Sequence, residues 1–166
     1  IHSQAQATQV AERELRRLVD KYGRDQVTKG MDAVQDYVER AVRQRIAELP
    51  DGTWEAVDHI DRDPGAGEGM IPIHIKMTIK GDQIIYDFEG SHPTISSIYN
   101  SAPGATFSAV VAGMKTFFPD LPLNSGFYRM VEVKAPKNSV VSAEWPVAVT
   151  GFLMPFEKIM NAIFEM

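Results

Sequence analysis

Cysteine is absent from the 166-residue sequence. Its absence excludes disulfide bonds, zinc–thiolate sites and a cysteine nucleophile within this chain. It also fits a reducing compartment, and we expect the protein to be cytoplasmic. Long apolar runs are missing as well, since none approaches the roughly eighteen residues that a membrane-spanning helix needs. No signal-peptide pattern opens the sequence, so we expect no membrane partner.

Basic charge is scarce in most of the chain. The net charge is −5, and residues 1–50 carry nine basic and eight acidic side chains. Residues 51–166 carry eight basic and fourteen acidic side chains. A protein that binds nucleic acid through its phosphates needs a basic patch or stripe. We therefore expect no nucleic-acid partner.

The composition that remains is that of a globular domain. Hydrophobic residues make up 44% of the chain and charged residues 23%, which is ordinary for a soluble fold. A chain of this length can bury one sizeable core. It begins at Ile1 rather than at a methionine, and it ends at Met166 within an apolar helical pattern. We therefore expect a fragment of a longer polypeptide.

Residues 1–49 have the apolar spacing of two helices. Apolar side chains recur every three or four residues over 7–22 and again over 27–49, which is the period of an amphipathic helix. Gly23 predicts the end of the first helix, and the turn at 50–52 predicts the end of the second. Because the connection is short, we expect an antiparallel helical hairpin.

From Thr53 the apolar period changes to two, which predicts strands. Residues 53–60 give a weak strand pattern, whereas 71–80 alternate clearly and 83–88 return after a turn at Gly81-Asp82. Residues 61–69 are rich in glycine and acidic side chains and predict a loop. One face of this strand hairpin is apolar and needs a cover, for which the helical pattern of residues 105–118 is a candidate. His74 lies on the polar face, and we expect it to be exposed.

The rest of residues 51–166 completes an α+β pattern. Residues 128–134 and 139–144 predict two further strands around a turn at 136–138, and 152–164 predict a terminal helix. The predicted fold is an N-terminal helical hairpin followed by a mainly antiparallel sheet packed by helices.

Two polar segments have the composition of ligand loops but lack the required residues. The segment 58–63 holds three carboxylates and a histidine, ligand types that suit a divalent metal. An EF-hand loop would need glycine and glutamate where Ala66 and Pro72 stand. The glycine-rich segment 65–69 lacks the lysine and hydroxyl of a phosphate loop and precedes a strand rather than a helix. We therefore predict no metal site and no nucleotide site in this chain.

The stretch from Asp87 to His92 holds the most chemistry. Asp87 and Glu89 lie on one side if the strand continues, Gly90 permits close backbone approach, and Ser91 offers a hydroxyl. A serine beside a histidine in sequence is not a catalytic pair, because the two must meet in space and need an orienting group. The structural alternative is a strand-to-loop bend whose polar side chains satisfy backbone groups.

Two asparagines are further candidates. Asn100 precedes the helical pattern of 105–118 and either caps a turn or binds an amide or carbonyl group. Asn124 lies in the turn Pro122–Gly126, which precedes a predicted strand. We assign no catalytic residue, and the candidate substrate-binding residues are Asp87, Glu89, Gly90, Ser91, Asn100 and Asn124.

Several of these segments, in this order and spacing, resemble the hydantoinase B family. They are Asp51-Gly52-Thr53-Trp54, the stretch Asp87–Ser91 followed by Asn100, and Pro122-Leu123-Asn124-Ser125-Gly126. The family comprises B-type subunits of ATP-dependent hydantoinases and 5-oxoprolinases, and alpha-type subunits of ATP-dependent ketone carboxylases.

The resemblance implies a subunit of a hetero-oligomeric enzyme. ATP would be bound by a hydantoinase A-type partner subunit, and a carbonyl oxygen would be activated by phosphorylation. The substrate would be a small cyclic amide, as in hydantoinases, N-methylhydantoinases and 5-oxoprolinases, or alternatively a ketone that is carboxylated. The histidines and aspartates linked to a divalent metal lie upstream in the family, so we expect this fragment to bind no cofactor and to be inactive alone. A non-catalytic interaction module is the second alternative.

Overall fold

The computed structural model describes residues 2–61 and 69–166 and has an α+β fold, as predicted. The predicted loop of 61–69 falls mainly outside the described residues. None of the helices within these ranges is both long enough and apolar enough to cross a membrane. The elements are α1 (His2–Tyr22), α2 (Arg24–Ala47), β1 (Gly52–Ile60), β2 (Ile71–Lys80), β3 (Gln83–Asp87), α3 (Pro103–Phe117), the 3-10 helix η2 (Ser125–Tyr128), β4 (Val131–Lys134) and α4 (Leu153–Glu165).

The sheet has the strand order β1-β2-β3-β4 and is mainly antiparallel. β1 pairs with β2 and β2 with β3 in antiparallel register, whereas β4 joins the edge of β3 in parallel. The turn at Gly81-Asp82 forms as predicted, and Gly81 has a φ of 61°, a conformation that glycine adopts without steric cost. Asp51 Oδ1 accepts a hydrogen bond from Gly81 N at 2.8 Å. The chain entering β1 is therefore tied to the β2–β3 turn.

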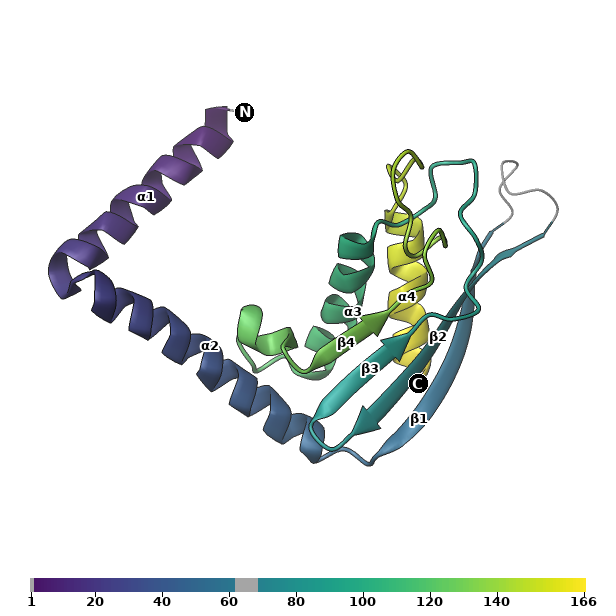
Figure 1. The fold of residues 1–166 in the computed structure, drawn as a ribbon, viewed down its shortest axis with the longest axis horizontal. Coiled ribbons are helices and arrows are strands. Elements are labelled where there is room, and N and C mark those ends of the chain that lie inside the picture. Colours follow the sequence, from purple (N-terminus) through teal and green to yellow (C-terminus); the bar gives the residue numbers. More distant parts are fainter. Residues whose placement is uncertain (1, 62–68) are drawn as a thin grey trace.

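Two helices cover one face of this sheet. α4 packs against β1 and β2, and α3 lies beside α4 (Figure 1). A Cβ on Gly113 of α3 would lie 3.1 Å from Ile163 of α4, so the two helices approach closely. Met114 and Phe118 belong to the same buried cluster as the apolar residues of β2 and β3. The expected cover from residues 105–118 is therefore present and is shared with α4.

The two N-terminal helices form where predicted, but they do not pack side by side. Gly23, with a φ of 81°, is the single residue between them, and a helical hairpin needs a loop of two to five residues to reverse the chain. The helices therefore diverge from Gly23 (Figure 1). The second half of α2 buries Val38, Val42 and Ile46, whereas the apolar stripe of α1 is exposed. We call residues 2–34 the arm.

The strands predicted after residue 127 are shorter than expected. Residues 125–128 form η2, so β4 begins only at Val131. Residues 139–144 form no regular strand, only isolated bridges of Ser139 to Pro93 and Ser142. Their backbone groups are instead bonded to other loops, because Val140 N donates to His92 O and Ala143 N to Ser101 O, both at 2.9 Å. The turn at Asn138 was predicted, and this residue has a φ of 56°.

Candidate functional site

The turn after β3 is held together by its own polar side chains. Asp87 Oδ1 accepts a hydrogen bond from Glu89 N at 3.0 Å, and Gly90 turns the chain with a φ of 90°. Ser91 Oγ accepts from His74 N at 3.1 Å and donates to His74 O at 3.2 Å. The hydroxyl of Ser91 therefore fixes the turn to β2. This is the structural alternative that the sequence allowed.

Glu89 and His92 of this turn, and His74 of the neighbouring strand β2, have side chains that are exposed or half-buried. Within the described part of the chain, the exposed carboxylate of Glu89 has no hydrogen-bond partner. His92 Nδ1 lies 2.7 Å from Pro93 O, and when Nδ1 donates this hydrogen bond the neutral ring keeps Nε2 as an acceptor. The ring of His74 is half-buried rather than exposed, and a Cβ on Gly90 would lie 3.5 Å from its Cγ atom. Sequence reasoning missed this proximity, because it joins β2 to the turn after β3.

Asn100 is fully buried and bonds the backbone of three residues. Its Oδ1 accepts from Ile95 N at 2.9 Å. Its Nδ2 donates to Ile95 O at 3.0 Å, Ser97 O at 2.9 Å and Ala148 O at 3.1 Å. The N-cap of α3 is Ala102, not Asn100. Asn100 therefore neither caps the helix nor presents its amide to solvent.

The hydroxyl of Thr106 is a second buried polar group that joins loop segments, and the sequence did not single it out. Thr106 Oγ1 donates to Val141 O at 2.6 Å and lies 3.0 Å from Ser101 Oγ. Ser101 N donates to Val140 O at 2.7 Å. We call residues 88–102 with 138–148 the loop cluster. The sequence signal available for Thr106 was its place in the first turn of α3, a helix whose N-cap residue, Ala102, has no side chain that can cap it.

Asn124 lies apart from the loop cluster, at the other end of β4. Its Oδ1 accepts from Gly126 N at 2.8 Å and caps η2. A Cβ on Gly126 would overlap the carbonyl oxygen of Gln35 on α2. The structure thus brings Asp87, Ser91 and Asn100 into one region of the fold and places Asn124 where η2 docks on α2.

The acidic segment near the end of β1 is tied to α4. Asp58 Oδ1 accepts from His59 N at 2.6 Å and lies 3.6 Å from Lys158 Nζ, and Asp58 Oδ2 lies 3.3 Å from Asn161 Nδ2. Asp63 falls outside the described residues. Within residues 2–61 and 69–166, no three His, Cys, Asp or Glu side chains gather in an arrangement that suits a metal ion.

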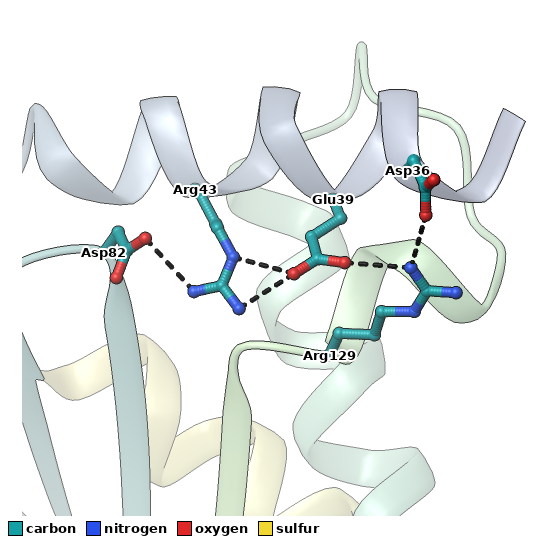
Figure 2. A network of polar contacts seen from close by, with 5 residues as sticks. All are labelled: Asp36, Glu39, Arg43, Asp82 and Arg129. Carbon is teal, nitrogen blue, oxygen red and sulfur yellow. Dashed lines mark hydrogen bonds and ion pairs between the residues drawn. The ribbon is translucent and has the colours of Figure 1, made fainter. Parts of the chain in front are cut away.

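The most extended ion-pair network joins α2 to the sheet rather than lining the loop cluster (Figure 2). Glu39 accepts hydrogen bonds from Arg129 Nη1 and from Arg43 Nε, both at 2.9 Å. Arg129 also bonds Asp36 at 2.8 Å, and Arg43 bonds Asp82 at 3.1 Å. The Arg129 and Arg43 hydrogen bonds lower the pKa of Glu39, which in turn raises the pKa of both arginines. The network therefore fixes α2 against η2 and the β2–β3 turn.

The whole chain, residues 1–166, matches the family described as Hydantoinase B/oxoprolinase. The chain belongs to this family. Its relatives include caprolactamase subunit beta of Pseudomonas jessenii, with 31% identity over 98% of this chain and 28% of the relative. 5-Oxoprolinase 1 of Arabidopsis thaliana is 29% identical over 82% of this chain and 12% of the relative. The acetophenone carboxylase delta subunit of Aromatoleum aromaticum is 26% identical over 88% of this chain and 22% of the relative.

The crystal structure of the ATP-dependent caprolactamase from Pseudomonas jessenii has the same fold. It matches with a TM-score of 0.88 and 31% identity over 98% of this chain, and this chain covers 28% of that one. A match of that coverage includes the arm. This Hydantoinase B chain thus spans less than a third of the length of these relatives. Its diverging N-terminal helices are part of the fold that it shares with caprolactamase.

Proposed function

We propose that this chain is part of the B-type subunit of an ATP-dependent hydrolase that opens small cyclic amides. The observation that carries the proposal is the match of 98% of the chain to caprolactamase, at 31% identity and a TM-score of 0.88. The hydantoinase and 5-oxoprolinase resemblance of the Asp87–Ser91 stretch supports the same reaction class. In this proposal an A-type partner subunit binds ATP, and the complex works in the cytoplasm.

The loop cluster would serve as a rigid part of the substrate site. Asp87, Ser91 and Asn100 hold the backbone through hydrogen bonds, so they would act by positioning. Glu89 would contact substrate through its exposed carboxylate, and Gly90 through its open backbone. Asn124 supports the docking of η2. In this proposal the family's metal is bound by residues upstream of this chain, and ATP by the partner subunit.

The test is to purify the complete B-type subunit together with its A-type partner and to measure ATP hydrolysis. We expect hydrolysis that depends on an added lactam or hydantoin, and a lower rate with Glu89→Gln. The 166-residue chain alone should neither hydrolyse ATP nor open the ring. Turnover by the isolated chain, or a complex that ignores all cyclic amides, would overturn the proposal.

A ketone carboxylase is the alternative that a specific match supports, because the acetophenone carboxylase delta subunit matches 88% of the chain. The same complex would then hydrolyse ATP only with a ketone and bicarbonate, and labelled bicarbonate would enter the product.

A non-catalytic interaction module is the second alternative, and it is favoured by the exposed arm. It predicts tight partner binding without turnover on either substrate class.

A further inference from the structure

A cavity of about 400 Å³ lies on the helix-covered face of the sheet, among the C-terminal ends of α2, α3 and α4. Its walls are mainly apolar and include Trp54, Ile79, Ile84 and Ile163. A Cβ on Gly52 would lie 2.7 Å from the indole of Trp54, so the glycine leaves room for this wall. The volume lies within the range of small-molecule pockets. The loop cluster contributes no residue to the cavity.

Tyr86 is the residue with a hydroxyl group among those that line the cavity. The residue lines the cavity and is only 2% exposed. Burial raises the pKa of Tyr86, so the hydroxyl is protonated and available as a donor. Among the described residues the Tyr86 hydroxyl has no hydrogen-bond partner. Every side-chain nitrogen or oxygen of these residues that is fully shielded from solvent does have a partner. The hydroxyl therefore keeps a small accessible surface, on a residue that lines the cavity.

The two charged side chains that line the cavity, Arg45 and Glu48, form an ion pair, and Arg45 is paired with Asp120 as well. Arg45 Nη1 lies 3.2 Å from Asp120 Oδ2, and Arg45 Nε lies 3.7 Å from Glu48 Oε2. A charged ligand inside the apolar walls would find no unpaired opposite charge among the lining residues to offset its loss of hydration. An uncharged molecule meets no such penalty, and a buried hydroxyl is stabilised when a ligand oxygen accepts its hydrogen bond.

We propose that this cavity binds a compact, uncharged, mainly apolar molecule whose carbonyl oxygen accepts a hydrogen bond from Tyr86. Binding requires neither ATP nor a partner subunit, and it takes place outside the loop cluster. The inference therefore goes beyond the proposed hydrolase activity and can fail or succeed independently of it.

The methionines provide a direct test by NMR of ¹³C-labelled methyl groups. Met77, Met114 and Met166 line the cavity, and the other five of the eight methionines do not. Titration of the 166-residue chain with cycloheptanone should shift the three cavity signals saturably and leave the five others in place. Tyr86→Phe should weaken cycloheptanone binding by about fivefold, the effect of one lost hydrogen bond. Cycloheptane, which has no acceptor, should bind both proteins equally.

Four results would overturn the inference. The first is the absence of a saturable shift, and the second is an equal shift of all eight signals. The third is equal cycloheptanone affinity in wild type and Tyr86→Phe. The fourth is loss of the cavity shifts in the complete B-type subunit, which would show that a protein segment fills the space. The ring of Tyr86→Phe keeps the packing, so this variant should fold with an unchanged or higher Tm.

Discussion

The arm has regular structure but is exposed, whereas the loop cluster lacks regular structure but is buried. The arm is regular helix, yet Leu15 and Leu18 on its apolar stripe are 44% and 46% exposed. The loop cluster has almost no regular structure, yet Asn100 and Ser101 are fully buried. Hydrogen bonding explains the difference, because a helix satisfies its own backbone groups, whereas a buried loop needs partners from elsewhere in the chain.

This comparison shows where sequence changes are costly in this fold. In the loop cluster one side chain serves several backbone groups, so its removal leaves several of them without partners. In the arm most of the described side chains are exposed, so the removal of one changes little. Four predictions test this contrast, in order of decreasing effect.

Replacement of Asn100 should have the largest effect. Asn100→Ala removes four hydrogen bonds within a buried site, and we expect the free energy of unfolding to fall by about 3 kcal/mol. Urea denaturation followed by circular dichroism would measure the change. Asn161→Ala is the matched control, because Asn161 makes one long hydrogen bond, to Asp58 at 3.3 Å. Equal losses of unfolding free energy in the two variants would contradict the proposed role of Asn100 in holding the loop cluster together.

Gly126 and Gly30 offer a matched pair for the docking of α2. A Cβ on Gly126 would overlap the backbone of α2, whereas nothing lies within 4 Å of a Cβ on Gly30. We expect Gly126→Ala to destabilise the fold by about 2 kcal/mol. Gly30→Ala should stabilise the helix by about 0.5–1 kcal/mol. Thermal unfolding of both variants checks the signs, and a Gly126→Ala protein as stable as wild type would refute this docking.

The ion-pair network should make the attachment of α2 sensitive to acid. The folded state holds the pKa of Glu39 below its ordinary value of 4.5. Its contribution to stability is therefore complete above that value and is lost as the pH falls through the folded pKa. Glu39→Gln should be less stable than wild type near pH 7, and the difference should shrink below pH 4.5.

Urea denaturation at several pH values would measure this difference. The control is Glu55→Gln, because Glu55 is exposed and has no ion-pair partner among the described residues. Its difference from wild type should stay small at every pH. A Glu39→Gln difference that is constant down to pH 3 would rule out the proposed linkage.

Changes on the arm should have the smallest effect on folding. Leu15→Ala with Leu18→Ala keeps helix propensity and should alter the free energy of unfolding by no more than about 0.5 kcal/mol. If the arm is an interaction surface, the same variant should lose affinity for its partner subunit in a pull-down assay. A large loss of folding stability would mean that the arm packs on the body in solution.

The sequence grouped candidate residues that the fold keeps together, apart from Asn124, but it did not specify which groups their side chains bond. The sequence singled out Asp87, Ser91 and Asn100, and these residues do lie in one region of the fold. Their hydrogen bonds to His74 and Ala148 join residues 17 and 48 positions apart in sequence. No local pattern specifies such partners. For the same reason the sequence did not specify the partner of Thr106, which bonds Val141 across 35 positions.

The sequence by itself determined the helices, the central strand hairpin and its turn, because these depend on apolar period and on glycine at positive φ. The resemblance to the hydantoinase B family was also recognisable in the sequence, because its turns and motifs are short local segments. Only the tertiary structure decided that the N-terminal helices diverge, that residues 139–144 form buried loop rather than strand, and that Tyr86 faces a cavity. Those outcomes depend on which distant groups complete each backbone hydrogen bond and fill each apolar space, and a one-dimensional pattern does not contain that information.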